Sequence, residues 1–291
     1  MTSGQHGKPS DATGASRGTI LITGCSSGIG HDAAVTMTTR GWRVFATARA
    51  DADLARLRDE GLEAVRLDYA DGASIAAGLD TVLAATGGRL DALCHNGAYA
   101  QPGALEDLDA ALLRAQFEAN LFGWHDLTRR AVPVMRRQGH GRIVFVSSVL
   151  GFVAARFRGA YVASKFAVEG YADTLRLELA DAGIDVVIIE PGPIASRFRA
   201  TAVAHAGNID IAGSVHRAAY EADLARQQAG GGAEERFRKG PDAVTAALIE
   251  AVESRRPRAR YRVTTPTRIA AILKRILPTR AMDRIAGGVR R

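Results

Sequence analysis

Short β-branched apolar runs recur along this chain, and most are separated by stretches with helical spacing. We interpret seven of these runs as strands: Thr19–Thr23, Arg43–Thr47, Glu63–Leu67, Leu90–His95, Arg142–Ser147, Asp185–Glu190 and Tyr261–Thr264. Parallel strands need crossovers of a dozen or more residues, which helices usually supply. The alternation therefore predicts an α/β fold, in which a doubly wound (Rossmann) parallel sheet of seven strands carries helices on both faces.

Helices are predicted between these strands, at 28–40, 54–60, 74–85, 105–138 in two pieces, 161–180 and 241–253. No linker divides the chain, so we predict one domain over residues 18–264. Within it, residues 193–236 are expected to form a mobile flap over the substrate, with the glycine-rich stretch 227–233 as a loop. A flexible leader, 1–17, precedes the domain, and a basic amphipathic extension, 265–291, follows it.

The distribution of charge and cysteine narrows the function classes. The net charge is 38 − 31 = +7, but residues 255–291 hold twelve basic residues and one acid, so the rest carries 26 − 30 = −4. A mildly acidic body argues against a nucleic-acid-binding domain. The distant Cys25 and Cys94 exclude a disulfide scaffold. Without a signal sequence or a long apolar span, the location is predicted to be cytoplasmic.

A glycine-rich turn directly follows the first predicted strand and opens the first predicted helix. It contains Thr23, Gly24, Cys25, Ser26, Ser27, Gly28, Ile29 and Gly30. Glycines allow a dinucleotide pyrophosphate to approach the backbone, and the helix N-terminus supplies N–H donors and a positive dipole. A turn that only reverses the chain is the alternative. The order of strand, turn and helix favours dinucleotide binding.

This turn resembles the TGxxxGIG motif of the short-chain dehydrogenase/reductase family at every specified position. Further family motifs follow in order at Asn120, Ser148, Tyr161-x-x-x-Lys165 and Pro191-Gly192. The resemblance covers roughly residues 19–263. The segment GWRVFATAR and the long C-terminal extension look most like the branch that contains hydroxysteroid and retinol dehydrogenases.

The resemblance implies an oxidoreductase that interconverts a carbonyl and an alcohol with a nicotinamide cofactor. Tyr161 would be the acid/base, and the Lys165 cation one helical turn away would lower the tyrosine pKa. Ser148 would orient the substrate oxygen, and Asn120 would hold a water that supplies protons. The seven histidines show no metal-ligand spacing, so no catalytic metal is expected.

NADP(H) is predicted over NAD(H), because Ala48 stands where NAD-using relatives carry an acid and Arg49 follows it. A guanidinium can bind the 2′-phosphate through two hydrogen bonds. The resemblance also places Asp68 at the adenine. The predicted cofactor-binding residues are Thr23, Gly24, Ser26, Ser27, Gly28, Ile29, Gly30, Arg49, Asp68, Asn96, Gly97, Tyr161, Lys165, Pro191, Gly192 and Ile194.

One segment departs from the family pattern. Where the family usually has Asn-Asn-Ala-Gly, this chain has His95, Asn96, Gly97 and Ala98. We interpret His95 as a hydrogen-bonded residue at a strand end, not as a catalytic one.

The substrate side of the predicted site is apolar. Its expected lining is Leu150, Phe152, Val153, Phe157, Ile194 and Phe198. Such a lining suits a small lipophilic carbonyl compound or alcohol.

Two other functions stay open: a regulator that senses NADP(H) without turnover, and a 3-oxoacyl-thioester reductase. The partners also stay open. Residues 266–286 have apolar residues at helical spacing among basic ones, so this stripe packs on the body or on a second subunit, or lies on an anionic membrane. The family often forms homo-oligomers, and nucleic acid is not expected as a partner.

Overall fold

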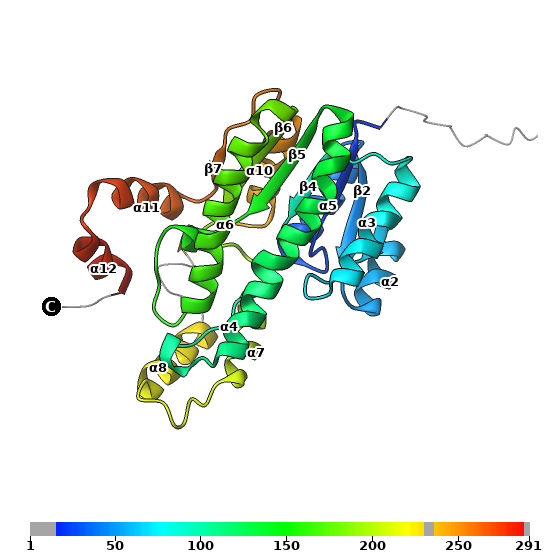
Figure 1. Ribbon diagram of the computed structural model, residues 1–291. Coiled ribbons are helices and arrows are strands. Elements are labelled where there is room, and N and C mark those ends of the chain that lie inside the picture. The colour runs from blue at the N-terminus through cyan, green and yellow to red at the C-terminus, as the bar shows by residue number, and fades with distance from the viewer. Residues whose placement is uncertain (1–15, 230–235, 288–291) are drawn as a thin grey trace, which may run out of the picture.

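A computed structural model describes residues 16–229 and 236–287 (Figure 1). Nearly all of the predicted leader, 1–17, lies outside these ranges, and so does most of the predicted loop at 227–233. Residues 227–229 belong to a helix and not to a loop.

Seven parallel strands form one sheet in the order β3-β2-β1-β4-β5-β6-β7. The strands are β1 (Thr19–Ile22), β2 (Arg43–Ala48), β3 (Glu63–Arg66), β4 (Ala92–His95), β5 (Gly141–Val146), β6 (Ile184–Glu190) and β7 (Arg260–Arg262). Because β1 pairs with both β2 and β4, the strand order reverses at β1. The predicted doubly wound sheet is confirmed.

Alternate side chains of each strand enter separate cores on the two faces of the sheet. In β1, Ile20 and Ile22 join one core and Leu21 joins the other. Helices α1 (Gly28–Thr39), α2 (Asp51–Asp59) and α10 (Asp242–Glu253) cover the first face. Helices α3 (Gly72–Thr86), α5 (Gly123–Gln138) and α6 (Gly159–Glu178) cover the second, as Figure 1 shows. Both faces are therefore buried, which explains why the central strands β1, β4, β5 and β6 are mostly apolar.

The predicted helical region at 105–138 consists of pieces joined by a wide turn. A short 3₁₀ turn, η1 (Leu105–Asp107), precedes α4 (Ala110–Phe117), and the π turn η2 (Glu118–Phe122) connects α4 to α5. Such π turns occur often at functional sites. Here the turn carries Asn120, which is fully buried.

The described part of the predicted flap is helical. It contains α7 (Phe198–His205), the short turn η5 (Ala206–Asn208) and α8 (Arg217–Ala229), at the lower end of the molecule in Figure 1. The hydroxyl of the buried Tyr220 accepts a hydrogen bond from the Ala104 N–H at 2.6 Å and donates one to the Asp107 carboxylate at 2.5 Å. These bonds dock α8 onto the loop before α4.

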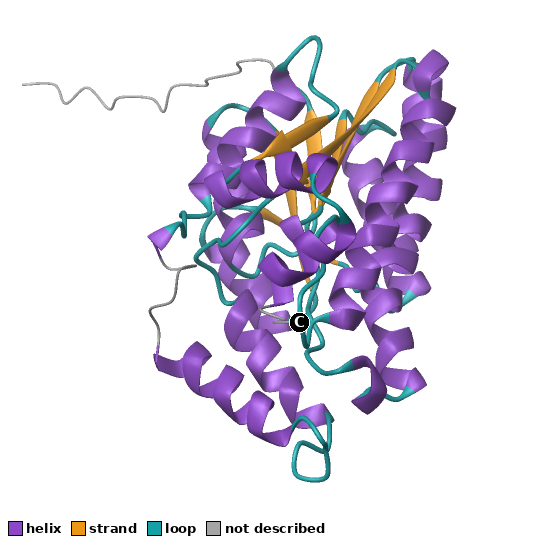
Figure 2. Cartoon of the chain, turned by 90° about the vertical axis from the view of Figure 1, so that its left-hand side faces the viewer, coloured by secondary structure: helices purple, strands orange, loops and turns teal. Residues whose placement is uncertain are grey.

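The C-terminal extension forms two helices, α11 (Thr265–Ile276) and α12 (Thr279–Gly287), which project from one side of the body (Figure 1). Figure 2 views that side directly. Ile269, Ile272 and Ile276 are 51%, 61% and 68% exposed. These three isoleucines are therefore mainly exposed, whereas Leu273 of the same stripe is half-buried. Packing on a second subunit and contact with a membrane stay open as alternatives. No helix in the described part of the chain is long and apolar enough to span a bilayer.

Candidate active site

A cavity of about 1200 Å³ lies at the carboxyl ends of the central strands. The chain leaves β1 toward α1 on one face of the sheet and leaves β4 toward α4 and α5 on the other. Connections that diverge in this way open a crevice at the point where the strand order reverses, and ligands of such sheets bind there. The cavity extends from the glycine turn to the flap.

The glycine turn forms a cradle at the N-terminus of α1. Gly24 and Gly28 have φ angles of +70° and +57°, which side chains rarely adopt. A Cβ at Gly24 would lie 2.5 Å from Gly97 Cα, and one at Gly30 would overlap the Gly24 carbonyl oxygen. The Ser27 side chain does not cap α1, and the first turn carries no acid. Free N–H donors and a positive dipole therefore suit a pyrophosphate.

Thr23 joins the two loops that border this cradle. Its hydroxyl oxygen accepts hydrogen bonds from the N–H groups of Asn96 at 2.9 Å and Gly97 at 3.1 Å. The hydroxyl also accepts a bond from Tyr69 at 2.9 Å. The Asn96 side-chain amide in turn donates to the Thr23 carbonyl at 3.0 Å. The β1 and β4 loops are thus fixed relative to each other across the crevice.

His95 fills the position that departs from the family pattern, and it is fully buried. Its ring nitrogens bond to the hydroxyls of Tyr69 at 2.7 Å and Thr128 at 2.9 Å. The ring packs against both Trp124 and Phe145, at centroid distances of 5.3 and 4.9 Å. Burial lowers the pKa of His95 to about 3, so the ring is neutral. The interpretation of His95 as a hydrogen-bonded structural residue is confirmed.

Lys165 is 1% exposed and lies one helical turn after Tyr161 on α6. Its ammonium group donates a hydrogen bond to the Val146 carbonyl at 2.8 Å and lies 4.4 Å from the ring centre of Trp124. Burial lowers the pKa of Lys165 to about 7, and the Glu169 carboxylate partly opposes this shift. A lysine with this pKa can exchange a proton near neutral pH.

The surroundings of Tyr161 correct one expectation from the sequence. Burial raises the pKa of the Tyr161 hydroxyl, and a hydrogen bond with Ser148 partly opposes the rise. The Lys165 Nζ lies 5.7 Å from the centre of the tyrosine ring. Desolvation thus outweighs the nearby cation in the protein itself, and the hydroxyl is held in its neutral, proton-donating form.

Ser148 and Asn120 each form hydrogen bonds that fix a segment of backbone near Tyr161. The Ser148 hydroxyl accepts a hydrogen bond from the Leu150 N–H at 3.1 Å and begins the 3₁₀ turn η3 (Val149–Gly151). The Asn120 amide donates to the Ser164 hydroxyl at 3.1 Å, which donates to the Tyr161 carbonyl at 2.8 Å. Asn120 therefore fixes the first turn of α6, where Tyr161 lies.

A buried charged cluster behind Lys165 was not predicted from the sequence. The Glu169 carboxylate pairs with Arg260 at 3.0 Å, and Arg260 also pairs with Glu190 at 3.0 Å. Burial is the main cause that raises the pKa of Glu169. The spacing of Glu169, four residues after Lys165, was a signal that could have revealed this part of the cluster.

Two arginines lie at the end of the cavity beside β2. Arg49 directly follows β2, is exposed and lines the cavity. Arg197, from the segment before α7, donates a hydrogen bond to the Ser26 carbonyl at 2.7 Å and lies 4.0 Å from the Asp53 carboxylate. The sequence offered no signal for Arg197, because its contact joins residues 171 positions apart.

Most predicted site residues line the cavity. Gly30 and Asn120 do not, and both are buried in the protein. The cavity-lining residues among the predictions are Thr23, Gly24, Ser26, Ser27, Gly28, Ile29, Arg49, Asp68, Asn96, Gly97, Ser148, Tyr161, Lys165, Pro191, Gly192 and Ile194. The structure thus brings the predicted catalytic and cofactor-binding residues to one place.

The substrate side differs in part from the expectation. The apolar residues that line it include Leu150, Phe157, Ile194 and Phe198. Phe152 and Val153, which directly follow η3, do not. Arginines 156, 158 and 199 also line the cavity, so its wall is less apolar than predicted. In the described ranges, no three His, Cys, Asp or Glu residues lie close enough to hold a metal ion.

Comparison with known proteins identifies the class that this fold and site define. The family model for short chain dehydrogenases matches residues 18–207. The chain therefore belongs to the short-chain dehydrogenase/reductase family. It is 39% identical to "Uncharacterized oxidoreductase YbbO" of Escherichia coli, over 92% of this chain and 94% of that protein. It is 31% identical to bovine retinol dehydrogenase 8, over 85% and 81% of the two chains.

Solved structures of this family share the fold. A short chain dehydrogenase/reductase from Burkholderia phymatum in complex with NAD has a TM-score of 0.75 and 26% identity, and the match covers 88% of this chain and 92% of that one. An actinorhodin polyketide ketoreductase variant with NADPH has a TM-score of 0.68 and 28% identity, with coverage of 84% and 95%.

Proposed function

We propose that this protein is an NADP(H)-dependent oxidoreductase that interconverts a carbonyl and an alcohol on a small lipophilic molecule. The observation that carries the proposal is that Tyr161, Lys165 and Ser148 line one cavity together with the glycine turn. The similarity to chains solved with NAD and with NADPH supports a nicotinamide cofactor.

The side chains around the reacting carbon divide the chemistry between them. The cofactor supplies or accepts the hydride. The Tyr161 hydroxyl donates a proton to the carbonyl oxygen during reduction and recovers it during oxidation. The Ser148 hydroxyl, adjacent to it, orients the substrate oxygen. Lys165 restores the tyrosine proton, since burial brings its pKa to about 7.

The choice of NADP(H) rests on the end of β2. Ala48 is 4% exposed and has no carboxylate. It therefore cannot accept a hydrogen bond from a ribose 2′-hydroxyl, and it does not repel a 2′-phosphate. Arg49 is exposed beside it and lines the cavity, so its guanidinium can bind a 2′-phosphate. Arg197 adds a second positive charge near this end of the cavity.

A turnover screen tests the proposal. The full chain would be given NADPH or NADH with steroid ketones, retinal, fatty aldehydes and cyclic ketones, and cofactor oxidation would be followed by absorbance. We expect turnover with NADPH on at least one lipophilic carbonyl compound. Tight NADPH binding without turnover on any of them would instead favour the regulator that senses NADP(H).

A 3-oxoacyl-thioester reductase is the second candidate, and one observation favours it. The exposed Arg156 lines the cavity with its guanidinium 4.9 Å from the centre of the Phe157 ring, so a cation lies beside the apolar wall where a phosphate-bearing acyl carrier would enter. Arg158 also lines the cavity but pairs with Asp223 at 3.2 Å. Acetoacetyl-coenzyme A in the same screen discriminates the two functions. Turnover of this thioester well above that of the free ketones would favour the second candidate.

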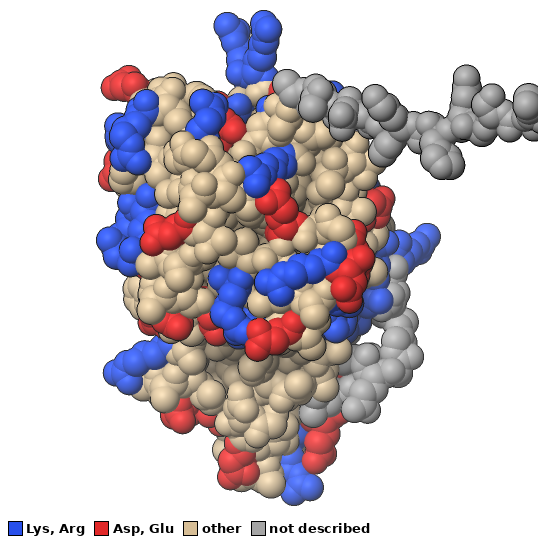
Figure 3. Space-filling view, turned by 90° about the vertical axis from the view of Figure 1, so that its right-hand side faces the viewer, with Lys and Arg blue, Asp and Glu red and all other residues tan. Residues whose placement is uncertain are grey.

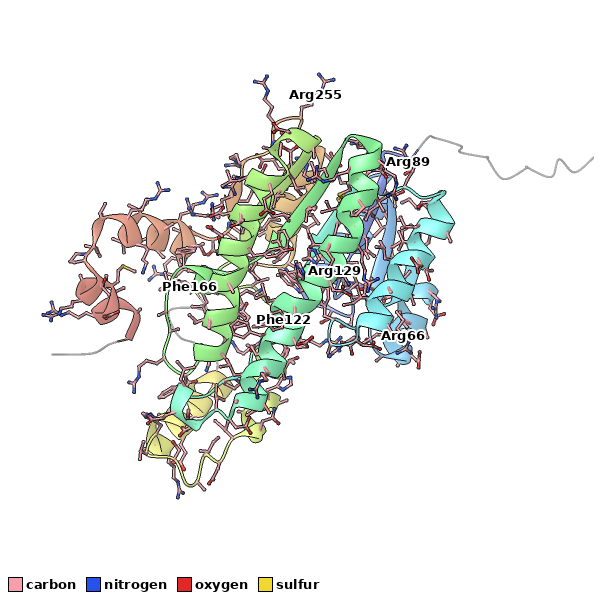
Figure 4. All side chains as sticks on the ribbon, viewed as in Figure 1. Arg66, Arg89, Phe122, Arg129, Phe166 and Arg255 are labelled. Atoms are coloured by element: carbon pink, nitrogen blue, oxygen red, sulfur yellow. The ribbon has the colours of Figure 1, made fainter. Side chains whose placement is uncertain are left out.

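We also propose that the chain forms a homo-oligomer through the face of η2 and α6. Phe122 and Phe166 are 51% and 41% exposed, and Figure 4 shows both on this face. Exposed aromatic side chains are enriched at protein interfaces. Light scattering after size exclusion would measure the mass, and a monomer at high concentration would contradict the proposal.

A further inference from the structure

Helix α11 buries small residues and exposes large apolar ones, which is the reverse of an ordinary amphipathic helix. Its buried residues are the small Thr267 and Ala271, which lie four positions apart on one face. Ile269, Ile272 and Ile276 are all more than half exposed. Because each residue advances about 100° around a helix, the centre of the isoleucine stripe lies about 150° from the buried pair. The three isoleucines thus point away from the protein, while Leu273 at the edge of the stripe is half-buried.

Basic residues accompany this outward stripe. Between residues 265 and 287 the chain has five basic residues and one acid, Asp283. The basic ones are Arg268, Lys274, Arg275, Arg280 and Arg284, and all five are exposed. On the opposite side of the molecule, by contrast, Lys, Arg, Asp and Glu are interspersed (Figure 3). The extension therefore combines exposed apolar side chains with a net positive charge.

Helix α12 continues this surface toward the cavity. Met282 is buried, while Ile285 is 60% exposed. Ala286, the next residue, lines the large cavity. The outward apolar surface therefore ends at the cavity wall.

We propose that α11 and α12 dock the protein onto an anionic lipid bilayer, with Ile269, Ile272, Ile276 and Ile285 in the headgroup boundary. Apolar side chains gain from leaving water, and the basic residues gain from the negative lipid surface. Docking would bring the cavity next to the phase in which lipophilic molecules concentrate, a consequence that rests on the proposed function.

Charge favours a bilayer over a second copy of this chain as the occupant. A two-fold interface places the same surface of each subunit against the other. Two extensions paired through their isoleucine stripes would bring ten basic residues and two acids together, since each contributes five and one. Like charges at close range oppose such pairing. Phosphate-bearing lipids supply the opposite charge instead.

Vesicle co-sedimentation of the full chain tests the proposal. Vesicles of phosphatidylcholine alone would be compared with equal mixtures of phosphatidylcholine and phosphatidylglycerol, each at low and high salt. We expect sedimentation with the anionic vesicles at low salt and less at high salt. If the full chain does not sediment with anionic vesicles at low salt, the proposal is overturned.

A stripe variant with its matched control separates specific docking from general stickiness. The triple variant Ile269→Gln, Ile272→Gln and Ile276→Gln is expected to partition at least about 100-fold less, because three apolar side chains no longer enter the bilayer. Val215→Gln, in the turn before α8 where Val215 is 87% exposed, should partition like the parent. Equal binding of the triple variant and the parent would overturn the proposal.

A charge variant tests the electrostatic part. Lys274→Gln with Arg275→Gln should weaken partitioning to anionic vesicles about 30-fold, which corresponds to about 1 kcal/mol for each residue. The matched control is Arg255→Gln with Arg256→Gln, since Arg255 lies at the top of the molecule, apart from α11 (Figure 4). The control should bind as the parent does. An equal loss in both pairs would show a nonspecific attraction and contradict the assigned surface.

The melting temperature and the molecular mass show whether the stripe is instead covered by the protein itself or by a second copy of the chain. The stripe variant should keep the melting temperature of the parent, because its changed residues are exposed. A lower melting temperature would place the stripe inside the protein and overturn the proposal. A dimer that dissociates in this variant, without vesicle binding by the parent, would assign the surface to a second copy. Turnover is not needed for any of these measurements, so failure here leaves the proposed function standing.

Discussion

The Tyr161 hydroxyl illustrates how one residue depends on its surroundings. The ring is 7% exposed, and burial raises its pKa even though a lysine lies one turn away on the same helix. Such a hydroxyl keeps its proton until a carbonyl oxygen is placed beside it. The proposed role of Tyr161 as a proton donor rests on this desolvation, and the hydrogen bond with Ser148 partly opposes the rise in its pKa.

At this position we predict that Tyr161→Phe abolishes turnover and changes NADPH affinity only a few-fold. The change removes the proton donor but keeps the ring, and it leaves the glycine turn intact. Steady-state kinetics and fluorescence titration with NADPH would measure the two effects. Turnover that stays above a few per cent of the parent's would remove Tyr161 from the mechanism.

Arg49 is the residue on which the proposed preference for NADP(H) rests. We predict that Arg49→Ala weakens NADPH binding by about 1.5–3 kcal/mol, the value of hydrogen bonds to a charged group. NADH binding should hardly change, since NADH has no 2′-phosphate. Titration of both cofactors would show the difference. Arg129→Ala is the matched control, because Arg129 is also exposed but does not line the cavity. Equal weakening of both cofactors by Arg49→Ala would mean that Arg49 does not contact the phosphate.

At the scale of elements, the start of α1 depends on contacts that only glycine allows. A Cβ at Gly30 would overlap the carbonyl oxygen of Gly24 and come 2.6 Å from the Asn96 amide nitrogen. Helix and turn therefore pack backbone against backbone. Gly170 in the middle of α6 is different, because nothing lies within 4 Å of the place where its Cβ would be.

These two glycines make a matched pair. We predict that Gly30→Ala lowers the free energy of unfolding by more than about 1 kcal/mol and weakens cofactor binding, because the turn must shift to make room. Gly170→Ala should raise the free energy of unfolding by about 0.5–1 kcal/mol, as alanine is the better residue inside a helix. Urea denaturation of both variants checks the signs. A stable Gly30→Ala variant with unchanged NADPH affinity would show that the turn tolerates a side chain.

At the scale of the whole molecule, the buried His95 links unfolding to pH. Its folded-state pKa of about 3 lies below its ordinary value of 6.5. Below pH 6.5 the unfolded chain therefore binds a proton that the folded chain excludes. The free energy of unfolding should fall as the pH drops from 6.5 toward 3, by up to about 1.4 kcal/mol for each pH unit.

His95→Asn tests this link, because asparagine does not titrate and is the residue that the family usually has there. We predict that the variant loses less stability than the parent between pH 6.5 and 4.5. Urea denaturation at several pH values in this range gives the two slopes, while the carboxylates contribute equally to both proteins. Parallel slopes would contradict the assignment of acid sensitivity to His95.

Local patterns were enough to predict the framework of this protein. Strands such as β5 and β6 each contain four consecutive apolar residues because both faces of a parallel sheet are covered, and this is visible in the sequence alone. The four-residue step from Tyr161 to Lys165 places both on one face of any helix. The glycines after β1 likewise mark a close approach of the backbone, wherever the chain then folds.

Features that depend on distant segments were decided by the tertiary structure. The pKa of Tyr161 rises because the surrounding segments exclude water from its hydroxyl. Arg197 reaches the glycine turn from a segment 171 residues away, and Phe152 does not line the cavity although Leu150 in η3 does. The stripe on α11 was visible as a pattern, but its direction was not. A periodic pattern tells which residues share a face, whereas only packing against the rest of the chain decides whether that face turns inward or outward.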